Sequence, residues 1–96
     1  MRLAWSALAL ADRDEIFDHI STDSPRAAVA VDDLIRRQVE RLIDFPESGR
    51  PGRVEGTREL VINRSPYLAA YRIVGDLVII LRVLHGSREW PDDVLD

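Results

Sequence analysis

The sequence lacks cysteine and lysine entirely. A chain without cysteine cannot form a disulfide scaffold, a thiolate zinc site or a cysteine nucleophile, and it fits a reducing cytoplasm. All 13 basic residues are arginine, against 17 aspartates and glutamates, so the formal net charge is −4. Because affinity for nucleic acid comes largely from neutralising phosphates, this acidic balance favours a protein partner.

Long hydrophobic runs are also missing from the sequence. No apolar run exceeds five residues, whereas a helix needs ~20 to cross a bilayer. Asp12 and Asp14 interrupt the N-terminal segment before it reaches the apolar length of a signal peptide. We therefore expect a cytoplasmic chain without a membrane segment, folded as a single domain over residues 1–96.

The first twenty residues predict a short strand followed by a helix. Residues 2–5 alternate in polarity, and Ser6 is a good N-cap for a helix over residues 7–20. The helix has an apolar stripe of Ala9, Leu10, Ile16, Phe17 and Ile20, and Asp12, Glu15, Asp18 and His19 face away from it. Arg13 interrupts the apolar stripe. We expect its aliphatic stem to pack while the guanidinium reaches solvent, and the alternative is contact with a partner.

A second helix is predicted to follow directly and to form a hairpin with the first. Ser24 and Pro25 are typical of a helix start, and Phe45 and Pro46 end the helix. Its core-facing stripe comprises Val31, Leu34, Ile35, Val39, Leu42 and Ile43. Residues 46–57 carry three glycines and two prolines, so we expect a surface loop there, which holds two arginines, Arg50 and Arg53.

Three β-rich runs complete the chain, at residues 58–62, 67–74 and 77–84. Gly75 and Asp76 form a two-residue hairpin loop with glycine first, as a type II′ turn requires. With that loop Ala69 faces Arg82, which places Arg82 diagonal to Tyr71 on one face.

The last run is almost uniformly apolar, which is typical of a central strand covered on both faces. The predicted fold is therefore α+β, in the order β-α-α-β-β-β, with an antiparallel-rich sheet. The helix hairpin covers one face of the sheet, and the other face is left for a partner.

The segment after the last strand gathers the side chains with the most chemistry. His85, Arg88 and Trp90 lie within six residues, close in the predicted fold to Arg82 and Tyr71. Such a cluster can bind an anion or position a phosphate. Alternatively, Trp90 closes the core edge and Arg88 pairs with a carboxylate. The sequence has no phosphate-binding glycine loop, zinc-protease motif or nucleophile elbow, and we expect no cofactor and no metal.

Several segments make the sequence resemble one known group of proteins. They are GRPGRVEGTRELVI (49–62), YLAAYRI (67–73), the Gly-Asp hairpin and IILRVLHGSREWP (79–91). The chain resembles the RelE/ParE superfamily of toxins from bacterial type II toxin–antitoxin modules, and the resemblance spans nearly the whole length. It implies the order of elements already derived. It also implies one of two activities, ribosome-dependent cleavage of mRNA in the RelE type or inhibition of DNA gyrase in the ParE type.

The resemblance to the nuclease type is incomplete. The arginine that follows the last strand in RelE-type toxins falls on Arg88, which matches. The strand arginine falls on Leu68, the C-terminal tyrosine falls near Val94, and the loop lysines have no equivalent. Together with the acidic balance, these departures favour ParE-like inhibition of gyrase.

The resemblance also implies partners and contact residues. We expect a cognate ParD- or RelB-like antitoxin to bind the chain in a hetero-oligomer and to neutralise it. The expected contacts with the target or the antitoxin are Arg13, Tyr71, Arg82, His85, Arg88 and Trp90. The first alternative is an mRNA endonuclease on the ribosome, with His85, Arg88 and Arg64 as catalytic residues. The second is a non-toxic homologue that only binds the antitoxin.

Overall fold

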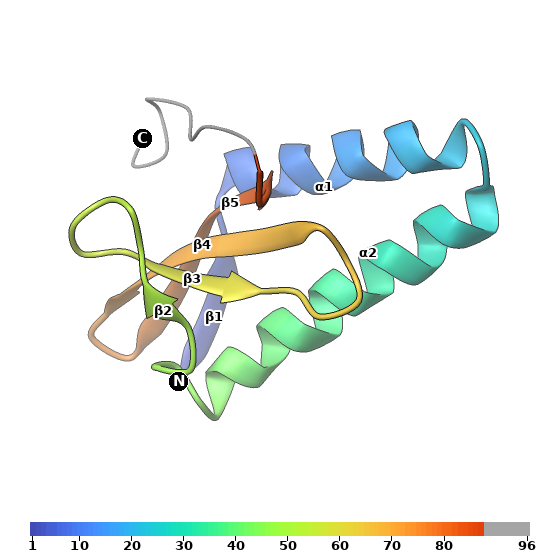
Figure 1. The fold of residues 1–96 in the computed structure, drawn as a ribbon. Coiled ribbons are helices and arrows are strands. Elements are labelled where there is room, and N and C mark those ends of the chain that lie inside the picture. The colour runs from blue at the N-terminus through green and yellow to red at the C-terminus, as the bar shows by residue number, and fades with distance from the viewer. Residues whose placement is uncertain (88–96) are drawn as a thin grey trace.

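Two helices pack on one face of a five-stranded sheet in the computed structural model, which describes residues 1–87 (Figure 1). The elements in chain order are β1 (Arg2–Trp5), α1 (Ala7–Ser21), α2 (Pro25–Glu40), the 3₁₀ turn η1 (Arg41–Ile43), β2 (Arg50–Pro51), β3 (Arg58–Val61), β4 (Tyr67–Val74) and β5 (Leu77–His85). This confirms the predicted α+β fold. One strand, β2, is additional to the predicted order.

The strand β5 lies inside the sheet, whose order is β1-β5-β4-β3-β2. It pairs in parallel with β1 and in antiparallel with β4, and α1 packs against it. A strand with neighbours on both edges and a helix over one face loses most of its water, which accounts for its uniformly apolar sequence. The predicted central position of this strand is confirmed.

The additional strand β2 forms within the segment that was expected to be a loop. Arg50 lies opposite Glu59, and Pro51 lies opposite Arg58. A proline is tolerated there because β2 is an edge strand and the missing N–H would face away from the sheet. The segment 46–57 is therefore partly fastened to β3, and the arginine at its start has a fixed position.

The hairpin between β4 and β5 begins as predicted. Val74 lies opposite Leu77, and Gly75 has φ +61°, the left-handed value that the first position of a type II′ turn needs. A side chain at this position would carry the strain of that backbone conformation, which glycine avoids.

The pairing then shifts by one residue at a β-bulge, and this corrects the predicted register. Ala70, rather than Ala69, lies opposite Arg82, and Leu81 is the extra residue. Neighbouring strand residues point to opposite faces, so Arg82 and Tyr71 do not share a face. The bulge lies just beyond the end of β1, where α1 instead of β1 lies beside β5.

Both helices begin at the predicted serines. The hydroxyl groups of Ser6 and Ser24 accept hydrogen bonds from the backbone N–H three residues on, at 3.0 and 3.1 Å. The second helix differs at its other end, because α2 stops at Glu40 and continues only as the η1 turn to Ile43. The tighter 3₁₀ winding moves Ile43 off the predicted core stripe and leaves it exposed.

The buried side of α1 also differs from the prediction. Leu10, expected in the core, is 47% exposed, whereas Asp12, expected in solvent, is only 7% exposed. Asp12 is buried because it bonds to β5, as shown below, so a polar contact rather than hydrophobicity sets this part of the helix face. The core itself comprises Ala9, Ile35, Val39, Leu42, Ile62, Ala69, Tyr71, Val78, Ile80 and Val83. Within residues 1–87, neither helix is long and apolar enough to cross a membrane.

Candidate functional site

The C-terminal end of β5 joins three segments that are distant in sequence. His85 lies opposite Tyr67 on β4, and the two rings meet edge to face with centroids 5.8 Å apart. The next residue, Gly86, donates its N–H to the carbonyl of Pro66 at 2.8 Å and accepts a bond from Nη2 of Arg53 at 3.2 Å. The loop after β2, the turn before β4 and the end of β5 therefore form one surface, which we call the His85 edge (Arg53, Tyr67, His85 and Ser87).

The ring of His85 is fixed by Ser87. The backbone N–H of Ser87 lies 3.2 Å from Nδ1, and its hydroxyl oxygen lies 2.7 Å from the same atom. A backbone N–H can only donate, so Nδ1 accepts and the proton of the neutral ring is on Nε2. In this arrangement the ring offers a hydrogen-bond donor rather than a general base.

A buried carboxylate holds the two loop arginines. Glu59 on β3 is 2% exposed, and its Oε1 accepts from Nη2 of Arg50 at 3.0 Å. Its Oε2 accepts from the backbone N–H of Arg53 at 3.0 Å and lies 3.6 Å from Nε of the same residue. The sequence showed these arginines but not their anchor, because the direction of Glu59 depends on the pairing of β2 with β3. The closest sequence signal was a lone acidic residue within an apolar run.

Arg82, an expected contact residue, is instead part of a buried pair. Its Nε and Nη2 bond to the two carboxylate oxygens of Asp12 at 2.8 and 2.9 Å. Asp12 also accepts from the backbone N–H of Val83 at 2.9 Å. This carboxylate thus replaces β1 as the partner of β5 beyond the bulge. Because 13% of the Arg82 side chain is exposed, little of it can reach a partner.

Tyr71 is fully buried, so it presents no surface to a target or an antitoxin. Its hydroxyl donates to the carbonyl of Pro46 at 2.7 Å and accepts from the backbone N–H of Gly49 at 2.9 Å. Burial raises the pKa of Tyr71 above its ordinary value. The residue fastens the start of the 46–57 segment to the sheet. Gly49 has no room for a side chain, because a Cβ there would lie 2.6 Å from the tyrosine oxygen.

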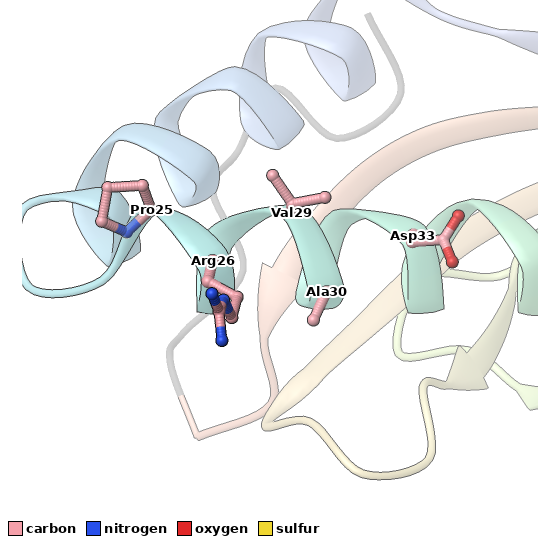
Figure 2. Close-up of a pocket in the computed structure, with 5 residues that line it drawn as sticks. All are labelled: Pro25, Arg26, Val29, Ala30 and Asp33. Atoms are coloured by element: carbon pink, nitrogen blue, oxygen red, sulfur yellow. The ribbon is translucent and has the colours of Figure 1, made fainter.

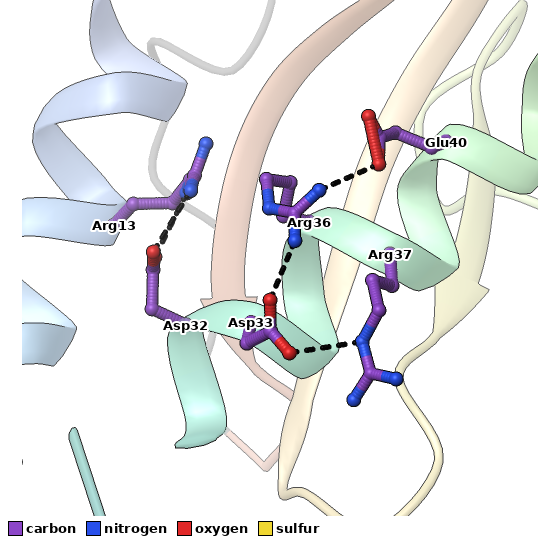
Figure 3. A network of polar contacts seen from close by, with 6 residues as sticks. All are labelled: Arg13, Asp32, Asp33, Arg36, Arg37 and Glu40. Atoms are coloured by element: carbon purple, nitrogen blue, oxygen red, sulfur yellow. Dashed lines mark hydrogen bonds and ion pairs between the residues drawn. The ribbon is translucent and has the colours of Figure 1, made fainter. Parts of the chain in front are cut away.

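Arg13 joins the two helices to the first strand. Its guanidinium forms two hydrogen bonds of 2.9 Å with Asp32 on α2 (Figure 3) and lies 4.6 Å from the ring centroid of Trp5. The expectation that its head group extends into solvent is therefore wrong. Side chains on two other elements, α2 and β1, hold this charge, which is more consistent with stabilising the fold than with reaching a partner.

The remaining predicted residues are apart from one another or outside the described part of the chain. Arg64 is exposed in the turn between β3 and β4, with φ +69°. Arg88 and Trp90 lie outside the described residues. Within residues 1–87 no group of three or more acidic, histidine or cysteine side chains could hold a metal ion. The His85 edge can donate hydrogen bonds to carbonyl or anionic groups through Arg53 and the imidazole.

Comparison with known proteins identifies relatives over almost the whole length. Residues 3–90 match the family described as ParE toxin of type II toxin-antitoxin system, parDE. The Y4kP protein of Sinorhizobium fredii is 46% identical over 90 residues, which is 94% of this chain and 93% of that protein. Toxin RelE2 of Caulobacter vibrioides is 34% identical over 87 residues, or 91% of this chain and 97% of that protein.

Solved structures of similar fold include two toxin–antitoxin systems. A chain of the chromosomal ParDE system from P. aeruginosa superposes with a TM-score of 0.81 at 35% identity, covering 88% of this chain and 95% of that chain. The RelBE2 toxin–antitoxin complex from Mycobacterium tuberculosis gives a TM-score of 0.59 at 28% identity, with the same coverage. The greater structural similarity is to the ParDE system.

Proposed function

The chain belongs to the family of ParE toxins of type II toxin–antitoxin systems, and from this premise we propose that it blocks growth by inhibiting DNA gyrase. The observation that carries this proposal is the ParE match over residues 3–90, together with the higher TM-score against the ParDE system than against RelBE2. A toxin that acts by binding a protein target needs a contact surface and no reaction centre. We place that surface at the His85 edge, and we expect Arg88 and Trp90, which lie outside the described residues, to contact the target as well.

Three observations support binding over catalysis. The formal net charge of −4 is unfavourable for holding a polyanionic RNA substrate. The hydrogen bond from the Ser87 N–H to Nδ1 leaves Nε2 of the neutral His85 ring protonated, so the ring lacks the free lone pair that a general base needs. Both Arg50 and Arg53 are already engaged by Glu59, which reduces the positive charge they offer.

We propose that a ParD-like antitoxin binds the groove between α1 and α2. Leu10, Arg13, Phe17 and Asp32 line this groove together with Asp14. The exposed Leu10 supplies apolar surface that the fold itself leaves uncovered. The structural neighbours are named as toxin–antitoxin systems, which supports an antitoxin partner. Tyr71 was expected to contact the target or the antitoxin, but its side chain is buried. We therefore place the antitoxin in the groove and not on the sheet face at Tyr71.

The decisive experiment compares two targets in parallel. The purified chain, with and without its antitoxin, is added to a gyrase supercoiling assay and to a ribosome-dependent mRNA cleavage assay. We expect loss of supercoiling, intact mRNA and full relief by antitoxin. His85→Ala should weaken inhibition, whereas Arg72→Ala, an exposed change on β4 away from this edge, should not. Cleaved mRNA with normal gyrase would overturn the proposal, and silence of a folded chain in both assays would favour a non-toxic antitoxin-binding protein.

A second candidate function, RelE-like mRNA cleavage, is favoured by one specific observation. Ser87 holds the ring of His85 with its hydroxyl oxygen 2.7 Å from Nδ1. When the ring is the imidazolium, this oxygen can accept the Nδ1–H while the Nε2 proton passes to a leaving oxygen, which returns the ring to neutral imidazole. Arg64 and Arg88 would then supply charge for the scissile phosphate. Under this alternative, His85→Ala abolishes cleavage and His85→Gln, which cannot transfer a proton, does not restore it.

A further inference from the structure

The outer face of α2 carries apolar surface that nothing in residues 1–87 covers. A shallow hollow on this face is lined by Pro25, Arg26, Val29, Ala30 and Asp33 (Figure 2). Val29 is 59% exposed, more than any other valine, isoleucine or leucine within residues 1–87. Together with Pro25 and Ala30, Val29 forms an apolar centre on this face, and Arg26 and Asp33 lie on either side of it.

The charges on both sides of this apolar centre are arranged with opposite sign. Arg26 precedes the centre and Asp33 follows it by the same number of residues, so the midpoint lies between residues 29 and 30. Farther from the centre, Asp23 in the turn before α2 and Arg36 on the helix are also of opposite sign and equally distant from this midpoint. A face whose charges change sign about its own midpoint is complementary to a copy of itself turned end to end.

We propose that α2 packs against α2 of a second copy of this chain, antiparallel about a twofold axis that passes between residues 29 and 30. In this arrangement Arg26 meets the partner's Asp33, Asp33 meets the partner's Arg26, and the two hollows close on each other. A parallel packing would instead place like charges together. The proposal does not depend on which target the toxin inhibits.

The helix geometry permits these contacts. Arg26 and Asp33 are seven residues apart, which is two helical turns and about 10 Å along the axis, so both lie on one stripe. Asp33 is held in place by Arg36 and Arg37 (Figure 3). The hydrogen bond from Arg36 also lowers the pKa of Asp33, so this carboxylate is ionised at neutral pH. Within the described chain no intramolecular ion pair engages Arg26.

A single pair of helices buries little area, so the dimer should be weak and depend on protein concentration. Sedimentation equilibrium of the free chain over a range of concentrations should show reversible dimers. Arg26→Asp and Asp33→Arg should each weaken dimerisation about tenfold, because two pairs across the axis become repulsive. The double variant with both changes should recover dimerisation, since opposite charges meet again. Arg72→Asp changes the net charge by the same amount as Arg26→Asp but lies on β4, so it should have no effect on dimerisation.

A cross-linking experiment gives a second, independent readout. The chain has no cysteine, so Ala30→Cys introduces a single thiol next to the proposed axis. Under oxidation it should form a disulfide-linked dimer, whereas Glu47→Cys, in the segment after η1, should not. The proposal is overturned if the folded chain is monomeric at all concentrations, or if the double variant dimerises no better than the single ones. If Arg26→Asp instead weakens only antitoxin binding, this face belongs to the antitoxin.

Discussion

Asp12 and Glu59 are the two acidic side chains that residues 1–87 bury, and each is satisfied by an arginine and a backbone N–H. Taking a carboxylate out of water is costly unless such partners replace the water. Both residues fix the sheet near the His85 edge. Asp12 holds the bulge of β5, and Glu59 holds the loop arginines beside Gly86.

Removing the carboxylate of Asp12 should therefore destabilise the chain strongly. Asp12→Ala leaves the largely buried guanidinium of Arg82 and the N–H of Val83 without this partner, and breaking a buried pair in this way costs about 3–5 kcal/mol. The free energy of unfolding in urea measures the effect. Asp14→Ala, an exposed change on the same helix, should cost less than about 1 kcal/mol. Equal losses in the two variants would contradict the structural role assigned to Asp12.

The buried hydroxyl of Tyr71 predicts a specific pH dependence. Its pKa is raised by burial above the ordinary 10.0, so the folded state holds this proton more tightly than the unfolded chain. The resulting stability is complete below pH 10 and is lost as pH rises through the folded pKa. Tyr71→Phe should cost about 1–3 kcal/mol at neutral pH, because two backbone groups lose their partner. The difference in unfolding free energy between wild type and variant should shrink above pH 10, and a constant difference would contradict the prediction.

At this scale the sequence allowed candidate residues to be selected but did not show their contacts. His85 was selected because imidazole, guanidinium and indole groups are close together in sequence. Tyr71 and Arg82 were also selected, but their partners, Gly49 and Asp12, are 22 and 70 residues away. A contact between such distant residues depends on the tertiary fold, and hydrophobic periodicity carries no information about it.

At the scale of elements, the two helix N-termini offer a matched comparison. The hydroxyl groups of Ser6 and Ser24 both cap their helices, but Ser6 also donates to the carbonyl of Leu81 at 2.8 Å. Ser24→Ala should cost about 1 kcal/mol, the usual value of a cap. Ser6→Ala should cost more, because the bulge also loses a hydrogen bond. Thermal or urea unfolding of the two variants would test the order, and the reverse order would be inconsistent with a role of Ser6 at the bulge.

The strands show why the elements were predictable while the register was not. The β-rich run of β4, the apolar run of β5 and the Gly75 turn were all visible in sequence and are confirmed. The one-residue bulge at Leu81 arises where α1 replaces β1 beside β5, and β2 exists only because Glu59 and its neighbours pair with the loop. Both features result from packing between elements, which local propensity cannot specify.

At the scale of the whole molecule, the proposed binding partners contact three separate surfaces, two on the helix pair and one at the His85 edge. We have proposed the groove between α1 and α2 for the antitoxin, the outer face of α2 for a second copy, and the His85 edge for the target. These surfaces belong to different elements, so variants at each can be assayed separately. A change that affects all three functions equally would indicate unfolding rather than a lost contact.

The charge of the whole chain gives a final prediction about its target. Residues 1–49 carry 6 arginines against 10 acidic residues, and residues 50–91 carry 7 against 4. This modest basic half has its loop arginines Arg50 and Arg53 engaged by Glu59. We therefore expect no binding of labelled duplex DNA or single-stranded RNA at physiological salt, measured by fluorescence anisotropy.

Weak binding that appears only at low salt would agree with this expectation, because each neutralised phosphate contributes about 0.9 to the slope of log affinity against log salt. A protein-directed toxin needs few such contacts, so its inhibition of gyrase should change little over the same salt range. Tight binding to RNA with a slope of several units would mean that the chain engages nucleic acid directly. That result would favour mRNA cleavage over gyrase inhibition before any enzyme assay is run.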